Sequence, residues 1–135
     1  MSNPVLRDAV LVGICTFRRP ELAATLDSLA RLDPCGLPLS VAIADNDRDP
    51  SARDRVEEIA ATHPLPITYL HAPEANISIA RNALLDHARA TGARFLVYLD
   101  DDERAEPAWL ARLVAAWRAG QQSGAGIGAV LGPVW

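Results

Sequence analysis

Lysine is absent from this sequence, and all 13 basic residues are arginine. A lysine nucleophile, a Schiff-base lysine and the lysine of a Walker-type phosphate loop are therefore excluded. The chain has only two cysteines, Cys15 and Cys35, and their positions match neither a CxxC pair nor a zinc site. We expect two reduced thiols, and a disulfide between them stays open at the level of sequence.

Long apolar runs, a targeting segment and a basic stripe are also missing. No apolar run approaches the roughly 18 residues that a membrane span needs, and the opening MSNPVLRDAV has no basic segment followed by an apolar one. The formal net charge is −4, which argues against nucleic acid as the main partner. We therefore expect a protein of the cytoplasm or of the inner face of a membrane.

Strand-like apolar runs alternate with helical patterns along the 135 residues. The predicted strands are 9–15, 39–44, 67–70 and 95–99. The predicted helices are 20–32, 51–62, 77–91 and 107–120, with Ser51 and Asp54 spaced like a capping box, Asn76 as a cap and Gly92 as a stop. A short fifth strand is possible within 127–131. The pattern predicts one α/β domain, Rossmann-like, with a mostly parallel sheet flanked by helices.

Polar residues follow each predicted strand where it ends. Cys15 and Thr16 end the first, Asp45 and Asn46 the second, and Glu74 and Asn76 follow the third. Asp100, Asp101 and Asp102 end the fourth. Because ligands of open parallel sheets bind beyond the carboxyl ends of the strands, these side chains are expected to border one site.

The acidic triplet is the most informative part of that edge. Two ionised carboxylates about 5 Å apart repel by about 3 kcal/mol at an effective dielectric near 20, and a divalent cation reverses the sign of this term. Along an extended backbone, Asp100 and Asp102 point one way and Asp101 the other. We expect an oxygen-ligated Mn²⁺ or Mg²⁺ here. The alternative is a solvated acidic turn without an ion.

Arginines and missing motifs narrow the choice of ligand. Arg81 lies one turn into the third predicted helix, near its positive end, where a phosphate is favoured. Arg18 and Arg19 are further phosphate candidates, with surface solvation as the alternative for both. The loop after the first strand, CTFRRP, has no glycine, so a dinucleotide fingerprint is absent, and so is the glycine of an EF-hand loop after Asp100.

Four stretches resemble successive blocks of family 2 glycosyltransferases with the GT-A fold. They are VGICTFRRPELAATLDSL, VAIADND, EANISIARNALLDHA and FLVYLDDDERAEPAWL, in the family's order. The last contains a DXD-like motif. Cys15 stands where the family usually has proline, Arg18 where it usually has asparagine, and Asn46 at the place of a second aspartate.

The resemblance implies an inverting transferase whose donor is a UDP-, dTDP- or GDP-linked sugar and whose acceptor is a glycan, a lipid or a protein. It implies Mn²⁺ or Mg²⁺ held by Asp102 and Asp100. The nucleotide-sugar-binding residues that it implies are Cys15, Thr16, Phe17, Arg18, Asp45, Asn46, Arg81, Asp100 and Asp101.

A general base is not evident, because the sequence contains no Asp or Glu after Glu106. The chain is therefore expected to be a GT-A-like nucleotide-sugar-binding domain, 1–135, that ends before an acceptor-binding half, with the catalytic residue unknown. The alternative function is a noncatalytic nucleotide-sugar-binding module. A sugar nucleotidyltransferase is a weaker alternative, because its glycine-rich opening loop is missing.

The remaining conspicuous side chains receive structural interpretations. His63, His71 and His87 have no metal-ligand spacing and are expected at the surface or as caps. Trp109 and Trp117 are expected to pack rather than stack on a ligand. Cys15 is expected to fill apolar space, since no base sits beside it in sequence.

Overall fold

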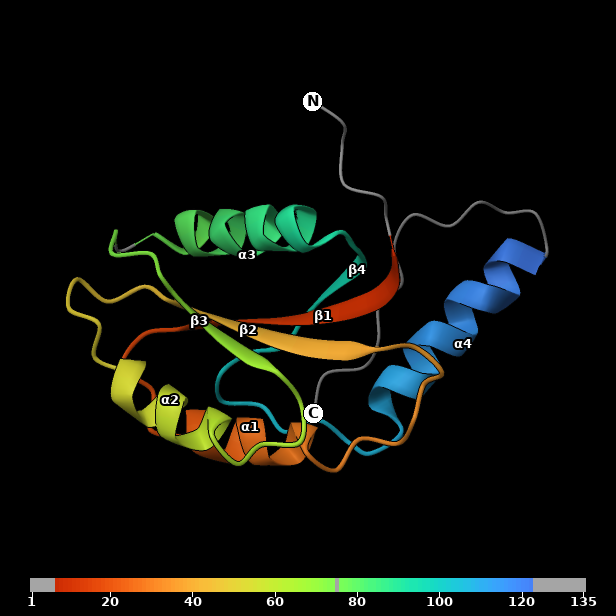
Figure 1. Cartoon of the computed structure of the whole chain (residues 1–135), viewed down its shortest axis with the longest axis horizontal. Helices are drawn as coiled ribbons and strands as arrows, with labels where there is room; N and C mark the ends of the chain where they lie inside the picture. Colours follow the sequence, from red (N-terminus) through yellow and green to blue (C-terminus); the bar gives the residue numbers. More distant parts are fainter. Residues whose placement is uncertain (1–6, 75, 123–135) are drawn as a thin grey trace.

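The protein is described by a computed structural model for residues 7–74 and 76–122. Its centre is a parallel sheet in the order β3-β2-β1-β4 (Figure 1). The strands are β1 (Arg7–Thr16), β2 (Leu39–Asp45), β3 (Ile67–His71) and β4 (Ala93–Tyr98). The helices are α1 (Leu22–Leu29), α2 (Arg53–Ala60), α3 (Ile77–Thr91) and α4 (Trp109–Gln122). The predicted alternation and parallel sheet are confirmed.

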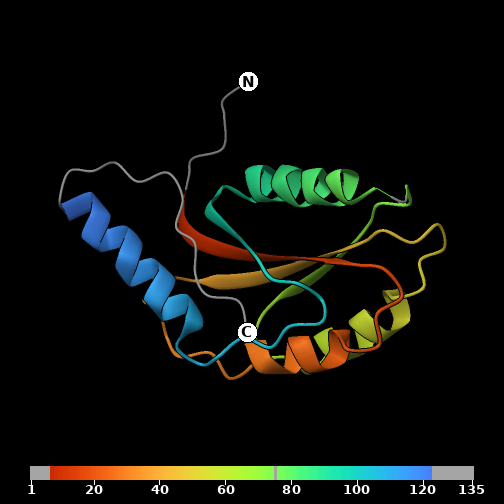
Figure 2. The same cartoon turned by 180° about the vertical axis from the view of Figure 1, so that it is seen from behind.

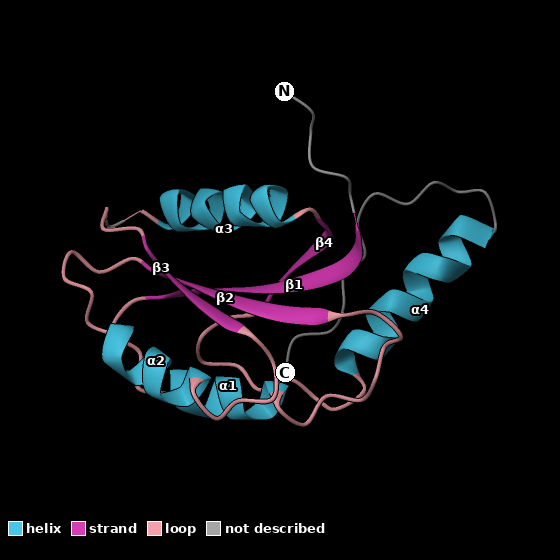
Figure 3. Ribbon diagram, viewed as in Figure 1, coloured by secondary structure: helices cyan, strands magenta, loops and turns pink. Residues whose placement is uncertain are grey.

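Helices cover both faces of the sheet, as Figures 1 and 2 show from opposite sides and Figure 3 shows by element type. α3 lies on one face, where its small residues Ala80 and Ala88 pack with Leu11 of β1. α1, α2 and α4 pack on the other, where Leu26 and Leu110 join Ile14 of β1 in the larger core. A sheet covered on both faces explains why the strands read as unbroken apolar runs.

The central place of β1 follows from its sequence. It pairs with β2 on one side and β4 on the other, and Val10, Leu11, Val12 and Ile14 are each at most 1% exposed. A Cβ at Gly13 would lie 3.1 Å from side-chain carbons of both Leu84 and Leu96. Glycine therefore allows α3 to approach the sheet closely above its middle strand.

Helix ends are confirmed at α3 and corrected at α2. The Asn76 side chain accepts a hydrogen bond from the Ser78 N–H at 2.8 Å, and Gly92 ends α3 with a left-handed φ of 75°. The capping box predicted from Ser51 is wrong. Ala52 is the N-cap residue of α2, and its methyl side chain makes no cap bond. The Ser51 hydroxyl donates instead to the Asp47 carboxylate at 2.7 Å.

Several smaller predictions also have clear outcomes. Cys15 and Cys35 are free thiols. Trp109 is buried, and Trp117 packs edge-on against Phe95 with ring centroids 4.7 Å apart. His63 bridges the backbone of Leu26 and Leu65, a structural role. The predicted fifth strand lies outside the described residues. Among the helices that are described, none combines the length and the apolar character that a membrane span requires.

Candidate functional site at the carboxyl edge of the sheet

The carboxyl ends of the strands meet at one edge and are joined there by backbone hydrogen bonds. The N–H of Asn46 donates to the carbonyl of Thr16 at 2.9 Å, and the N–H of Ala72 donates to that of Asp45 at 2.8 Å. On the other side of β1, the Leu99 N–H donates to the Gly13 carbonyl at 3.1 Å. The loops that follow the strands are therefore neighbours, as the parallel topology requires.

A cleft of about 260 Å³ opens at this edge between the ends of β1 and β4 and the start of α3. Its lining residues are Cys15, Arg19, Ile77, Arg81, Tyr98, Leu99, Asp100, Asp101 and Asp102. Five of the predicted site residues are in this set, namely Cys15, Arg81 and the acidic triplet. Three carboxylates and two guanidinium groups thus share one opening, which suits a ligand that carries both phosphate and metal charge.

The acidic triplet lies in the turn that follows β4, and its three side chains differ in exposure. Asp101 points inward and is 9% exposed, with its Oδ2 accepting a hydrogen bond from the Thr16 hydroxyl at 2.9 Å. Its Oδ1 lies 3.5 Å from Nε of Arg19. Asp100 and Asp102 are exposed. The inward aspartate therefore contacts protein groups through both carboxylate oxygens, and the other two carboxylates remain open to a ligand.

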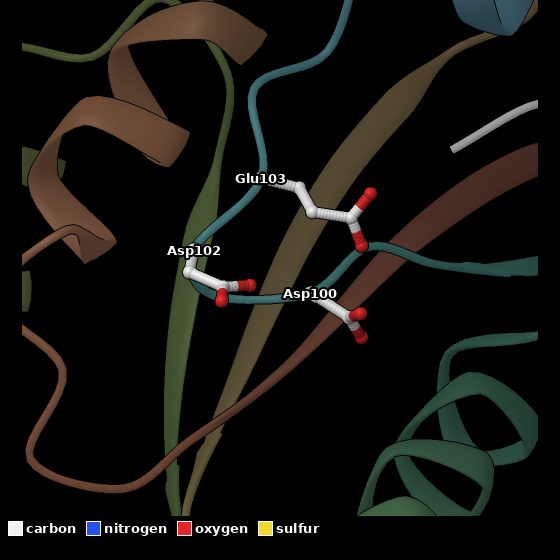
Figure 4. Close-up of side chains that lie close together, drawn as sticks. All are labelled: Asp100, Asp102 and Glu103. Atoms are coloured by element: carbon white, nitrogen blue, oxygen red, sulfur yellow. The ribbon is translucent and has the colours of Figure 1, made fainter. Parts of the chain in front are cut away.

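Asp100 and Asp102 form an oxygen-rich group with Glu103, the next residue along the turn (Figure 4). One carboxylate oxygen from each lies within 4.8 Å of the others. Oxygens bound to one Mg²⁺ at about 2.1 Å are at most about 4.2 Å apart, so a small side-chain rotation brings these residues to the spacing that a divalent cation needs. The residues present therefore fit such an ion.

Glu103 is a member of this group that the sequence analysis did not name, although it directly follows the acidic triplet. Burial, a hydrogen bond to Asp100 and the nearby charges of Asp100 and Asp102 raise the pKa of Glu103 to about 7. A divalent cation bound between these carboxylates would oppose the part of this shift that comes from Asp100 and Asp102.

Arg81 and Tyr98 form the wall of the cleft opposite the turn. The Arg81 guanidinium carbon lies 5.8 Å from the centroid of the Tyr98 ring, and both residues are exposed. Burial raises the pKa of the Cys15 thiol, the Arg81 charge opposes that shift, and Asp101 and Asp100 add to it. Cys15 is accordingly a neutral, half-buried thiol on the cleft floor, in line with the apolar role expected for it.

Arg18 is not among the residues that line the cleft. Its Nε and Nη2 bind the two carboxylate oxygens of Asp47 at 2.8 and 3.2 Å, and its backbone has a left-handed φ of 49°. Phe17 beside it is 49% exposed, and the Arg18 guanidinium carbon lies 5.4 Å from its ring centroid. The neighbouring Arg19 faces the cleft instead.

Asp45 and Asn46 lie at the same edge, but their side chains form hydrogen bonds mainly within the protein. The fully buried Asp45 carboxylate accepts from the N–H groups of Asp47 and Ala52 at 3.1 and 3.0 Å and from the Tyr69 hydroxyl at 2.6 Å. The Asn46 side-chain NH₂ donates to the backbone carbonyls of Ala72, Glu74 and Asn76. Asp45 therefore fixes the loop after β2, and Asn46 fixes the loop before α3.

Comparisons with known proteins agree with this arrangement. A model of the family described as "Glycosyl transferase family 2" matches residues 11–130. The succinoglycan biosynthesis protein ExoM of Rhizobium meliloti (strain 1021) is 50% identical over an alignment of 135 residues that covers 99% of this chain. The chain spans only 40% of the length of that relative.

Solved structures share the fold. The mannosyltransferase PcManGT from Pyrobaculum calidifontis, in complex with GDP-Man and Mn²⁺, superposes with a TM-score of 0.65 at 24% identity over 84% of this chain and 35% of that one. TarS 1-349 of S. aureus, in complex with UDP-GlcNAc, gives 0.62 at 15% identity over 91% of this chain and 37% of that one. With its parallel sheet, its flanking helices and the family match over most of its length, this chain belongs to glycosyl transferase family 2 and has a GT-A-like fold.

Proposed function

We propose that this chain is the nucleotide-sugar-binding part of an inverting glycosyltransferase whose donor is a UDP-, dTDP- or GDP-linked sugar. The observation that carries the proposal is the cleft at the carboxyl edge, in which three consecutive aspartates face two arginines. A sugar nucleotide bound with a divalent cation matches this charge pattern, because its diphosphate is anionic and its cation needs oxygen ligands. The complexes of the structural relatives with GDP-Man and Mn²⁺ and with UDP-GlcNAc support the same ligand class.

Asp102 and Asp100 would hold the cation, Mn²⁺ or Mg²⁺, with Glu103 as a neighbouring oxygen donor. When bound, this cation neutralises charge on the departing nucleoside diphosphate. Asp101, bonded to Thr16 and close to Arg19, keeps the turn in register with the end of β1.

Arg81 and Arg19 are the residues that would meet the diphosphate. Arg81 is exposed in the cleft wall one turn into α3, where the helix dipole adds positive potential. Arg19 has one long contact with Asp101 and an exposed side chain, whereas Arg18 is held by Asp47. Five further predicted site residues lie at the same edge of the sheet but do not line the cleft: Thr16, Phe17, Arg18, Asp45 and Asn46. Their contact with the nucleoside stays a prediction.

The transfer step would be a direct displacement. The acceptor hydroxyl attacks the anomeric carbon, the bond from that carbon to the diphosphate oxygen breaks, and a general base takes the hydroxyl proton. No Asp or Glu follows Glu106, and the chain spans 40% of its curated relative. We therefore assign the base and the acceptor site to another part of a longer protein. The role of that relative in succinoglycan biosynthesis favours a glycan acceptor over a lipid or a protein. A location in the cytoplasm or at the inner face of a membrane stays a prediction.

A noncatalytic nucleotide-sugar-binding module is the second candidate, favoured by the absence of an acidic residue in positions 107–135. Release of nucleoside diphosphate from the donor in the presence of a glycan acceptor separates the two functions when it is measured on the longer protein that carries the base and the acceptor site, because only the transferase produces it.

A thermal-shift panel tests the donor site itself. UDP-, dTDP- and GDP-sugars are added with and without Mn²⁺ to the wild type, to Asp102→Asn and to the control Asp86→Asn on the exposed surface of α3. One sugar nucleotide is expected to raise the Tm of the wild type and the control in a Mn²⁺-dependent way, and to leave Asp102→Asn unchanged. No shift with any sugar nucleotide would contradict the proposal.

A further inference from the structure

The turn that carries the acidic residues is hydrogen-bonded to two hydroxyl groups of α1. The Thr25 hydroxyl donates to the backbone carbonyl of Asp101 at 3.0 Å. The Ser28 hydroxyl oxygen accepts from the N–H of Ala105 at 2.9 Å. The Ser28 hydroxyl also donates to the backbone carbonyl of Thr25 at 2.6 Å, so the two residues are linked along the helix. Positions 101 and 105 of the turn are therefore attached to adjacent turns of one helix.

These two attachments lie on either side of the open carboxylate of Asp102. Asp100 and Asp102 are exposed, so side-chain packing does not fix their carboxylates. What fixes their spacing is the backbone of the turn, which is tied at Leu99 to β1, at Asp101 to Thr25 and at Ala105 to Ser28. A backbone shift at position 101 or 105 would move both carboxylates relative to each other.

Thr25 is an unusual choice for helix packing alone. It is 1% exposed on the core-facing side of α1, where Leu22, Leu26 and Leu29 are its apolar companions. Valine would fill nearly the same volume without a buried hydroxyl. A threonine within a helix commonly bonds the carbonyl one turn back, whereas the Thr25 hydroxyl bonds a residue 76 positions away in the chain. The hydroxyl thus serves the turn and not the helix.

We infer that Thr25 and Ser28 are positioning residues that set the affinity of the acidic turn for its divalent cation. The inference rests on the proposed function, which places the cation at Asp100 and Asp102. Cation ligands must lie within a few tenths of an ångström of their ideal places, and loss of the groups that orient them typically costs about 10- to 100-fold in metal affinity. α1 is by this account part of the donor site, although none of its residues lines the cleft.

Mn²⁺ binding to the full chain, followed by the loss of the electron-paramagnetic-resonance signal of free Mn²⁺, tests this without any catalytic assay. The variants are Thr25→Val and Ser28→Ala, each with a partner that keeps the hydroxyl, Thr25→Ser and Ser28→Thr. Val56→Ala, in the same core but far from the turn in sequence, is the control for lost stability. Circular dichroism selects a temperature at which every variant is folded.

Thr25→Val and Ser28→Ala are expected to weaken Mn²⁺ binding about 10-fold or more. The affinity of Thr25→Ser should stay within about twofold of the wild type. Val56→Ala should bind Mn²⁺ normally despite its lower Tm. Normal binding by both hydroxyl-less variants would overturn the inference, and so would a loss in Val56→Ala as large as theirs. The variant Asp102→Asn separates a failure of the proposed cation site from a failure of the positioning role. If it binds Mn²⁺ as the wild type does, the proposed site is wrong. If Asp102→Asn does not bind Mn²⁺ while Thr25→Val and Ser28→Ala bind it as the wild type does, only the positioning role is wrong.

Discussion

Arg18 and Asp47 form a bidentate ion pair that joins the loop after β1 to the loop after β2, with contacts of 2.8 and 3.2 Å. The Asp47 carboxylate is buried, and it also accepts a hydrogen bond from Ser51. Arg18 adopts a left-handed backbone conformation to make this pair. The pair therefore shapes the edge of the sheet and leaves Arg19 as the arginine of this loop that faces the cleft.

The Arg18–Asp47 pair is expected to contribute stability that acid removes. Hydrogen bonds from Arg18 and Ser51 lower the pKa of Asp47 from 3.8 to about 2. A lowered carboxyl pKa stabilises the fold above pH 3.8, and this contribution is lost as the pH falls towards 2. In urea unfolding, Asp47→Asn should be less stable than the wild type near neutral pH, and the gap should narrow below pH 3.8. A gap that stays constant to the lowest pH would disprove the assignment.

Replacing the two adjacent arginines should have different effects. Arg19→Gln is expected to weaken binding of a nucleoside diphosphate about 10- to 100-fold, the value of a charge-assisted hydrogen bond of about 1.5–3 kcal/mol. Its affinity for the nucleoside alone should not change. Arg18→Gln should lower the free energy of unfolding through the loss of its pair with Asp47. Calorimetric titration with both ligands checks this, and equal losses for nucleoside and diphosphate in Arg19→Gln would refute a phosphate contact.

Glu103 should make the metal-free protein less stable as the pH rises. Its pKa is raised from 4.5 to about 7, mainly by burial and by Asp100. Because the folded state then binds the proton more tightly than the unfolded state, the contribution of Glu103 to stability is fully present below pH 4.5 and is lost as the pH rises to about 7. In chelator, Glu103→Gln should abolish this decline, and added Mg²⁺ should offset it in the wild type. A wild-type profile that is flat across this range would show that the three carboxylates do not interact as described.

Tyr69 is expected to stabilise the loop after β2 through Asp45. Its hydroxyl donates to a fully buried carboxylate at 2.6 Å, and burial together with Asp45 raises the pKa of Tyr69, so the donor keeps its proton. Tyr69→Phe should cost about 1.5–3 kcal/mol in urea unfolding. Tyr98→Phe, at an exposed position of the cleft wall, is the matched control and should cost less than about 0.5 kcal/mol. Equal costs for the two variants would argue against a bond of special strength at Asp45.

Much of the fold was predictable, because the signals were local and consistent. The unbroken apolar run of β1 indicated a strand covered on both faces, and the structure places it in the middle of the sheet. Asn76 and Gly92 marked the ends of α3 correctly. The prediction that Asp101 points away from Asp100 and Asp102 agrees with their exposure, although these residues lie in a turn and not in the extended backbone from which it was argued.

What could not be predicted depends on contacts between distant residues. Arg18 and Arg19 are equivalent in sequence, and only the left-handed backbone at Arg18 decides which of them turns to Asp47. The capping box at Ser51 failed for the same reason, since its hydroxyl is taken by Asp47. The hydrogen bond from Thr25 to Asp101 joins residues 76 positions apart, and no periodicity in the sequence predicts it.

The most direct test of the donor site is anomalous diffraction from crystals grown with Mn²⁺ and a nucleoside diphosphate. The account predicts a Mn²⁺ peak at about 2.2 Å from a carboxylate oxygen of Asp102, with Asp100 beside it and the diphosphate on the side of Arg81 and Arg19. A peak elsewhere on the protein, or a diphosphate bound in the cleft with no ion at the acidic turn, would contradict it.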